Sequence, residues 1–362
     1  MTALGDRLAA RIAAEGPLTL ASYMAECLLD PDHGYYATRD PFGREGDFTT
    51  APEISQMFGE LLGLCLAQCW IDQGRPASIR LAELGPGRGT LMADVLRAVR
   101  SVPGFREAAT VHLVEASATL RKVQRERLAR EGVEWHGTVG DLPSGPLYLI
   151  ANEFFDALPI RQFERDGSGW AERQVGLVGD RLAPGLAPTV PVGLLSHRLA
   201  DTRPGDIVEI CPALPAIAGE IGHRIAASGG VAIVIDYGGW HSLGDTFQAV
   251  RAHKPVDPFA NPGTADLTAH VDFEALSTAF SQAGAAVTGM TPQGLFLERL
   301  GITARAEALA SRLAPAARAA HIAAHRRLTH PAEMGRLFKA IACYPSHCPP
   351  PPGFDPADRH DP

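Results

Sequence analysis

The chain has 362 residues, of which 46% are hydrophobic and 20% are charged, a composition typical of a globular protein with a substantial core. The net charge of -8 and the lack of basic runs disfavour a nucleic-acid partner, and no apolar stretch predicts membrane insertion. The six cysteines form no Cys-x-x-Cys pair, so we expect reduced thiols in a reducing compartment and no metal site. The first residues include an early acid and no apolar segment of signal type, so we expect a cytoplasmic location.

The first seventy residues predict helices and one irregular stretch. Two short amphipathic patterns within residues 4–29 predict two packed helices. Residues 30–50 are rich in Gly, Asp and Tyr, which is typical of either a packed surface loop or a lid over a site. Thr50 stands three residues before Glu53, the spacing of a capping box, so we expect one long helix over residues 52–72.

A short apolar run over residues 79–82 leads into the most informative stretch of the chain. It reads Glu83-Leu84-Gly85-Pro86-Gly87-Arg88-Gly89-Thr90, after which apolar residues recur at helical spacing. The pattern predicts a strand, a tight turn and a helix, because glycine adopts backbone angles that other residues avoid and lets a ligand approach the backbone. The glycines stand at i, i+2 and i+4 rather than at the i, i+2 and i+5 of dinucleotide-binding proteins, which disfavours NAD.

This stretch resembles motif I of class I S-adenosylmethionine methyltransferases. The resemblance implies S-adenosylmethionine as cofactor, with Glu83 beside its methionine end and Gly87 beneath its sulfonium. The six residues expected to bind it here are Glu83, Gly85, Pro86, Gly87, Gly89 and Thr90. The alternative is a plain strand-to-helix turn, since glycine-rich turns are common.

Further polar residues follow the next expected strands. A second strand over residues 111–115 closes on Glu115, where an acid meets ribose hydroxyls in doubly wound folds; the alternative is a solvated strand-end carboxylate. A third strand over residues 133–139 is followed by Asp141, which could accept from an adenine amino group. A fourth strand over residues 147–151 opens into Asn152-Glu153-Phe154-Phe155-Asp156, which should lie nearest the transferring group.

The rest of the chain departs from a simple alternation of strands and helices. Gly167 lies within a hairpin signal that marks residues 161–212 as an insertion, expected to cover the site. Residues 239–267 lack periodicity and are expected to form a long functional or mobile loop. The remaining expected elements are a helix over 215–227, a strand over 231–238, a helix over 271–283, a strand and turn over 287–295, helices over 303–329 and a strand over 337–342.

The expected organisation therefore has five parts. They are an N-terminal helical region with a lid loop (1–75), the first half of a core (76–160), the insertion (161–212), the second half of the core with loop and helical insertions (213–343), and a disordered Pro-rich tail (344–362). His321 and His325 have a spacing that can ligate zinc, but a solvated helix face is the favoured interpretation.

Several blocks together resemble one family along residues 4–343. They are Asp32-His33-Gly34-Tyr35-Tyr36, Gly46-Asp47-Phe48-Thr49-Thr50-Ala51-Pro52-Glu53-Ile54-Ser55, the motif I stretch, the Asn152 turn, Asp236-Tyr237-Gly238 and Thr268-Ala269-His270-Val271-Asp272-Phe273. They are similar to the MidA family, which includes a mitochondrial complex I assembly methyltransferase. The resemblance implies an α/β class I methyltransferase fold, a Rossmann-like seven-stranded sheet with an N-terminal helical region and insertions covering the active site.

We therefore expect an S-adenosylmethionine-dependent enzyme that methylates a protein, with arginine as the leading acceptor and a respiratory complex I subunit as a candidate target. Guanidinium is a poor nucleophile and needs paired carboxylates to orient it, a role that Glu153 and Asp156 could fill with Asn152 beside them. The alternatives are a cofactor-binding assembly factor without turnover and a small-molecule O- or N-methyltransferase.

Overall fold

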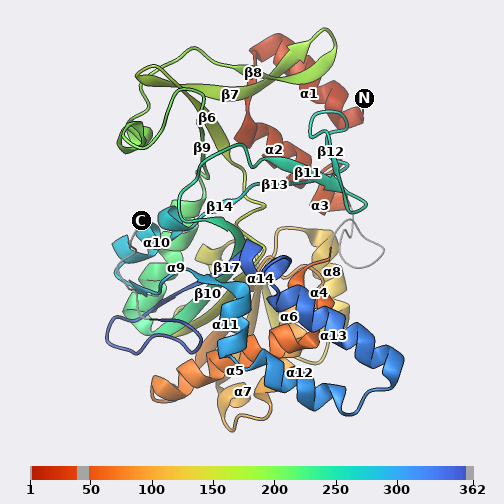
Figure 1. Ribbon diagram of the computed structural model, residues 1–362, viewed down its shortest axis with the longest axis vertical. Coiled ribbons are helices and arrows are strands. Elements are labelled where there is room, and N and C mark those ends of the chain that lie inside the picture. Colours follow the sequence, from red (N-terminus) through yellow and green to blue (C-terminus); the bar gives the residue numbers. More distant parts are fainter. Residues whose placement is uncertain (1, 39–48, 356–362) are drawn as a thin grey trace. The chain divides into compact units, whose positions relative to one another are not determined.

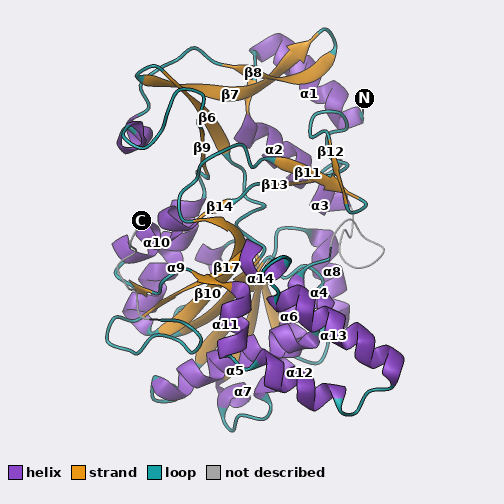
Figure 2. Ribbon diagram, viewed as in Figure 1, coloured by secondary structure: helices purple, strands orange, loops and turns teal. Residues whose placement is uncertain are grey.

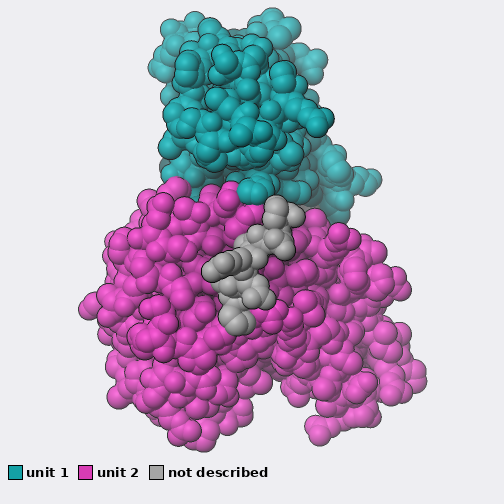
Figure 3. Space-filling view, turned by 60° about the vertical axis from the view of Figure 1, so that its left-hand side comes forward, with its two compact units in different colours: residues 1–48, 156–214, 241–272 teal, residues 49–155, 215–240, 273–362 magenta. Residues whose placement is uncertain are grey.

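The computed structural model describes residues 2–38 and 49–355 (Figures 1 and 2). The chain divides into two compact units, coloured separately in Figure 3. Unit 1 comprises residues 1–48, 156–214 and 241–272, and unit 2 comprises residues 49–155, 215–240 and 273–362. Among the described residues, no helix combines the length and apolar character needed to cross a membrane.

Unit 2 contains the doubly wound sheet that the motif I stretch predicts. Its strands follow the order β15-β17-β10-β5-β2-β3-β4. The bounds are β2 Ile79–Leu84, β3 Ala109–Val114, β4 Val133–His136, β5 Leu147–Asn152, β10 Gly230–Gly239, β15 Ala286–Val287 and β17 Phe338–Tyr344, with β16 Thr291–Pro292 paired to β17. The pairs from β10 to β4 are parallel, whereas β17 runs antiparallel to β10 and β15.

The central strands are apolar because helices cover both faces of a parallel sheet. Every residue of β5 is buried, and β2 is buried at all positions except Arg80. The covering helices are α5 Gln56–Asp72, α6 Thr90–Val99, α8 Ala118–Arg127, α9 Leu214–Ser228 and α10 Phe273–Gln282, followed by α11 Gln293–Arg299, α12 Ile302–Ala310, α13 Pro315–Thr329 and α14 Met334–Leu337. A short α7 Phe105–Ala108 precedes β3, and η1 Val139–Asp141 precedes β5.

Close packing of α5 on α6 depends on two glycines one helical turn apart. A Cβ on Gly59 would lie 2.6 Å from the Cβ of Asp94, and one on Gly63 would lie 3.0 Å from the Cα of Val95. Larger residues at these positions would push the helices apart. The motif I helix is therefore held by a second helix as well as by its own strand.

The expected long helix over residues 52–72 is divided in the structure. The short α4 Ala51–Ile54 is followed by Ser55, which has an extended backbone and caps α5. The Ser55 hydroxyl oxygen accepts a hydrogen bond from the Met57 N–H. The expected capping box is wrong, because the Thr50 side chain makes no capping bond and Glu53 instead accepts a hydrogen bond from the Thr90 hydroxyl. A tertiary contact thus overrides the local spacing.

Unit 1 contains two antiparallel sheets. One has the order β1-β7-β6-β9, with β8 on β7, and the other has the order β12-β11-β13. The bounds are β1 Leu18–Thr19, β6 Arg161–Asp166, β7 Gly169–Val178, β8 Arg181–Leu186, β9 Ile207–Ile210, β11 Gln248–Arg251, β12 Lys254–Val256 and β13 Asp266–Thr268, with helices α1 Ala3–Glu15, α2 Leu20–Leu29 and α3 Tyr35–Thr38. The predicted N-terminal helices and the predicted β6–β7 hairpin are confirmed.

The prediction of an irregular loop over residues 239–267 is wrong for part of that range. β11 pairs with both β12 and β13, and Ala249 and Leu267 are buried in a core with residues of α1 and α2. The strands are three or four residues long, too short for alternation to stand out in the sequence.

The tail is ordered as far as residue 355, which corrects the expectation of disorder for that part. The Phe354 ring lies 4.5 Å from the ring of Phe296, centroid to centroid, and Phe354 is buried. Arg299 forms an ion pair with Asp355 at 2.8 Å. An aromatic contact and an ion pair therefore dock a proline-rich segment whose composition by itself suggests disorder. The expected boundaries at 75, 160, 212 and 343 otherwise stay a prediction.

Candidate active site

The glycine turn between β2 and α6 has the backbone geometry that its sequence requires. Gly85, Gly87 and Gly89 have φ angles of 59°, 51° and 75°, in the left-handed region that favours glycine. Gly89 caps α6, and its N–H donates to the Pro86 carbonyl at 2.7 Å. A Cβ on Gly85 would lie 2.9 Å from the Phe154 ring, so the turn after β5 packs directly on the glycine turn.

Glu83 is a buried acid with one unsatisfied oxygen. Its Oε2 atom has no hydrogen-bond partner among the described residues. Burial is the main cause that raises the pKa of the carboxyl to about 8; a hydrogen bond from the Met92 N–H opposes this shift, and the nearby Glu115 charge adds to it. A buried carboxyl of this kind is expensive to ionise unless a cationic group pairs with it. The position therefore fits a ligand that carries a positive charge.

Glu115 directly follows β3 and is held by two donors. Its Oε1 accepts from the Ser117 N–H at 2.8 Å, and its Oε2 accepts from the Gln124 amide at 3.1 Å. Burial raises the pKa of Glu115, and these hydrogen bonds oppose the shift. The Ala116 N–H also donates to this carboxylate, and a carboxylate can accept about four hydrogen bonds, so Glu115 can still receive a hydroxyl donor.

Gln124 is a residue of the site that sequence reasoning missed. Its Nε2 donates to the Gly87 carbonyl at 2.8 Å as well as to Glu115, and its Oε1 accepts from the indole N–H of Trp135 at 2.9 Å. Gln124 thereby links the glycine turn to the strand-end acid. The available signal was its position between Leu120 and Leu128 on the buried stripe of α8, where an apolar residue would ordinarily stand.

Asp141 is exposed and caps its own turn. Its Oδ2 accepts from the Thr138 N–H at 2.8 Å and from the Thr138 hydroxyl at 2.9 Å, and these bonds lower the pKa of the carboxyl. The preceding strand ends at His136 rather than at the expected residue 139. The expected contact of Asp141 with adenine stays a prediction.

The turn after β5 holds Glu153 in a backbone conformation that is rare for a residue with a side chain. Its φ angle is 51°, which for a residue other than glycine costs about 1–3 kcal/mol and must be supported by the surroundings. The Glu153 N–H donates to the Ile235 carbonyl at 2.9 Å. Its Oε1 accepts from the Ala51 N–H at 3.1 Å and from the Asn152 amide at 3.0 Å. The carboxylate is therefore oriented by fixed donors.

Asp236 shapes the same turn from the neighbouring strand. It is fully buried in β10, and its Oδ2 accepts from the N–H groups of Phe154 and Phe155 at 3.2 and 3.0 Å. Sequence reasoning quoted this acid as part of a family block but assigned it no role. A lone acid at the end of a continuous apolar strand was the available signal, because β10 pairs with β5 and brings Asp236 to the turn.

Asp156 begins the second segment of unit 1, whereas Glu153 belongs to unit 2. The Asp156 carbonyl accepts from the Ala269 N–H at 3.0 Å. In the same unit the Tyr36 hydroxyl donates to Asp266 at 2.8 Å, and burial, followed by the charges of Asp266 and Asp156, raises the pKa of Tyr36. The expected pairing of Asp156 with Glu153 stays a prediction.

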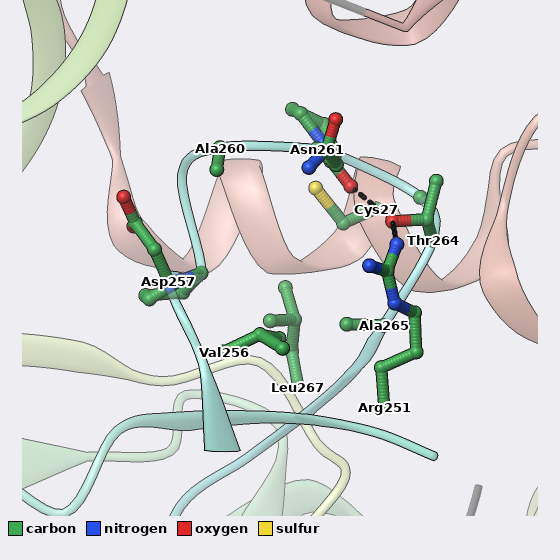
Figure 4. Close-up of a pocket in the computed structure, with 12 residues that line it drawn as sticks. Cys27, Arg251, Val256, Asp257, Ala260, Asn261, Thr264, Ala265 and Leu267 are labelled. Atoms are coloured by element: carbon green, nitrogen blue, oxygen red, sulfur yellow. Dashed lines mark hydrogen bonds between the residues drawn. The ribbon is translucent and has the colours of Figure 1, made fainter. Parts of the chain in front are cut away.

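Unit 1 also contains a cavity of about 240 Å³ beside α2. Figure 4 shows its lining, which includes the Cys27 thiol from α2 and the Arg251 side chain, which donates to the Thr264 hydroxyl. Val256 and Leu267 supply apolar walls. Burial raises the pKa of the Cys27 thiol to about 11, so the thiol stays protonated near neutral pH.

Three features of unit 2 occur together: β17 runs antiparallel beside β10 in an otherwise parallel sheet, a glycine turn follows β2, and an acid follows β3. Together they define a class I S-adenosylmethionine-dependent methyltransferase. Residues 61–291 match the model of a family described as "Putative S-adenosyl-L-methionine-dependent methyltransferase". The chain belongs to this family, and S-adenosylmethionine is its cofactor. The predicted fold class and cofactor are confirmed.

Relatives and solved structures agree with this assignment. The chain is 36% identical to the protein arginine methyltransferase NDUFAF7 of Xenopus tropicalis over 95% of its own length and 86% of the relative, and 37% identical to that of Homo sapiens over 92% and 82%. A crystal structure from Burkholderia thailandensis with bound S-adenosyl-homocysteine is 31% identical, with a TM-score of 0.82 and coverage of 98% of this chain and 93% of that one. The resemblance to the MidA family is confirmed.

The expected cytoplasmic location is wrong by the same comparison. The relatives from Xenopus, Homo sapiens and Drosophila melanogaster are all mitochondrial proteins by name. Unpaired cysteines indicate a reducing environment, and the lack of a signal-type apolar segment disfavours secretion, but neither observation identifies a compartment.

Proposed function

We propose that this methyltransferase modifies an arginine side chain of a protein. The observation that carries the proposal is the identity of more than a third with relatives named protein arginine methyltransferases, over nearly the whole chain. A respiratory complex I subunit is the candidate acceptor that the resemblance to the MidA family implies. The oriented carboxylate of Glu153, beside the glycine turn, supports a cationic acceptor.

The residues around the glycine turn fit the cofactor. In this proposal Gly85, Pro86, Gly87 and Gly89 form the cradle, and the three glycines have the left-handed backbone angles that residues with a Cβ rarely adopt. Glu83 pairs with the cofactor's ammonium through its unsatisfied oxygen. The other residues proposed to bind the cofactor are Thr90, Glu115 for the ribose, Asp141 for adenine, and Asn152.

Methyl transfer requires that the acceptor nitrogen be positioned and oriented toward the methyl group. When bound, S-adenosylmethionine supplies an electrophilic methyl group on a sulfonium sulfur. In this proposal Glu153 and Asp156 hold the guanidinium through charge-assisted hydrogen bonds and turn one nitrogen toward that methyl group. As the bond from nitrogen to the methyl carbon forms, the bond from sulfur to that carbon would break and S-adenosylhomocysteine would leave. The Glu153 carboxylate would accept the proton that the nitrogen loses. The Asn152 side-chain amide keeps Glu153 oriented by donating to its Oε1 atom at 3.0 Å.

Transfer of labelled methyl groups tests this function. Purified enzyme and methyl-labelled S-adenosylmethionine are incubated with lysate, and the products are resolved by size and analysed by mass spectrometry. We expect label in protein, on arginine. Label in small molecules would favour a small-molecule methyltransferase, and absence of label with intact cofactor binding would favour an assembly factor. Either outcome contradicts the proposal.

Cofactor binding is expected to release close to one proton per molecule at pH 7. In the protein without cofactor, Glu83 has a pKa of about 8 and is mostly protonated at pH 7. An ammonium partner lowers this pKa, so the proton is released on binding. Affinity should therefore rise between pH 6 and 8, and the calorimetric heat should depend on the ionisation enthalpy of the buffer. The controls are Glu83→Gln and the ligand methylthioadenosine, which lacks the ammonium; neither should show proton release. A buffer-independent heat with the wild-type protein would exclude Glu83 as the partner.

A further inference from the structure

Three metal-ligating side chains gather at the outer strands of the unit 2 sheet. Among the described residues, His112, Glu134 and His136 form a group whose ligand atoms all lie within 4.8 Å of one another. The parallel register pairs His112 with Glu134 and Val114 with His136, and residues two apart on a strand share a face. We propose that His112, Glu134 and His136 form a zinc site, distinct from the cofactor-binding turn.

The separations are close to those that a tetrahedral zinc ion imposes. His112 Nδ1 lies 3.0 Å from His136 Nε2 and 3.7 Å from Glu134 Oε2. Zinc bonds of about 2.0–2.2 Å in tetrahedral geometry place ligand atoms about 3.3–3.6 Å apart, so these two separations need an adjustment of a few tenths of an ångström. The separation between Glu134 and His136 is within 4.8 Å, and the exposed Glu134 side chain can move to shorten it. Two imidazoles and a carboxylate are a donor set that zinc accepts, with water in the fourth position.

His112 presents the correct nitrogen for a ligand. The Thr110 hydroxyl donates to the Ile79 carbonyl at 3.1 Å, so its oxygen is left to accept from His112 Nε2 at 2.9 Å. The proton of neutral His112 is thereby on Nε2, and the Nδ1 lone pair is directed at His136. Thr110 acts as the outer partner that fixes the tautomer of a metal-ligating histidine.

The charges around the cluster are compatible with a cation. The negative charge beside His112 comes from Glu134, and Arg80 supplies a positive charge nearby. Asp141 also interacts electrostatically with His136. His112 is 1% exposed whereas Glu134 is 61% exposed, so the buried ligand is rigid and an ion can enter from the Glu134 side.

The cluster is joined to the expected ribose site through the backbone. The His136 carbonyl accepts from the Glu115 N–H at 3.1 Å and from Arg121 at 2.8 Å, and Arg121 also donates to the Glu115 carbonyl at 2.7 Å. An ion bound across β3 and β4 would hold these edge strands together. We therefore expect zinc to raise the melting temperature, since it binds the folded state.

The test is metal binding to the full chain, independent of methyl transfer. Zinc titrated into metal-free protein with reduced thiols is followed by calorimetry, and cobalt is used as a spectroscopic probe for tetrahedral coordination. We expect one tight equivalent per chain and a tetrahedral cobalt spectrum with nitrogen and oxygen ligands. His136→Gln and Glu134→Gln, at the less buried positions, should weaken binding, by more than about 100-fold for the histidine.

Two further variants distinguish a preformed zinc site from adventitious metal binding. Thr110→Val keeps the shape of the side chain but removes the acceptor for His112, and should weaken zinc binding by about 10–100-fold. His321→Gln, on the helical histidine pair of α13, is the matched control and should leave the tight equivalent unchanged. Absence of a tight equivalent in the wild-type protein, or binding that survives His136→Gln and disappears when thiols are blocked, would overturn the proposal.

Discussion

Gly87→Val is expected to abolish measurable binding of S-adenosylmethionine in a protein that still folds. Gly87 has a φ angle of 51°, and its carbonyl accepts from the buried Gln124 amide, so the backbone cannot move to an ordinary conformation without breaking that link. A β-branched side chain in the left-handed region is strongly disfavoured, and its methyl groups would occupy the space through which the backbone approaches a ligand. Calorimetric titration of the purified variant measures the effect.

Gly167→Val is the matched control for this variant. Gly167 has nearly the same φ angle, 53°, in the β6–β7 turn, where an added Cβ would meet no atom within 4 Å. It shares the backbone strain of Gly87→Val, about 1–3 kcal/mol, and should keep its cofactor affinity. Wild-type affinity in a folded Gly87→Val protein, shown by circular dichroism, would refute the assignment of the glycine turn as the cofactor site.

Glu153→Gln is expected to lower turnover by about a hundredfold or more with cofactor affinity nearly unchanged, the scale of a misaligned reacting group. The glutamine Oε1 can still accept from the Ala51 N–H and the Asn152 amide, so the turn should keep its conformation. What the substitution removes is the negative charge that holds and orients the guanidinium. Cofactor affinity by calorimetry and methyl incorporation into protein are measured on the same preparation.

Glu126→Gln, an exposed carboxylate on α8, serves as the control and should keep full turnover. Asp156→Asn tests the second carboxylate of the expected pair and should also reduce turnover without loss of cofactor. Wild-type turnover in Glu153→Gln would exclude the guanidinium clamp. Methyl groups found on a residue other than arginine would show that the proposed acceptor is wrong, even if Glu153 is essential for turnover.

Sequence reasoning was most successful where a local pattern has one physical meaning. Gly85, Gly87 and Gly89 predicted the strand, turn and helix because alternating glycines are needed where the backbone takes left-handed angles. It failed where distant residues compete for the same group. Glu53 has the spacing to cap a helix at Thr50, but it accepts from Thr90 instead, which is 37 residues away in the chain.

Local sequence patterns also did not predict the short paired strands or the docking of the C-terminal segment. β11 pairs with β12 and β13 over a few residues each, too few for a periodic signal. Phe354 lies in a proline-rich segment whose composition predicts disorder, yet its ring packs on Phe296. In both cases the decisive apolar contact is supplied by another part of the chain.

By itself, the sequence determined the class of the protein and most of its parallel core, because buried parallel strands are continuous apolar runs and strand ends carry the ligand-binding residues. Only the tertiary structure decided which groups hold the strand-end acids in place. Gln124 joins Glu115 to the glycine turn, and Asp236 holds the turn that contains Glu153, through hydrogen bonds between strands and helices far apart in the chain. Such bonds depend on sheet register and helix packing, and these are settled only when the whole core is assembled.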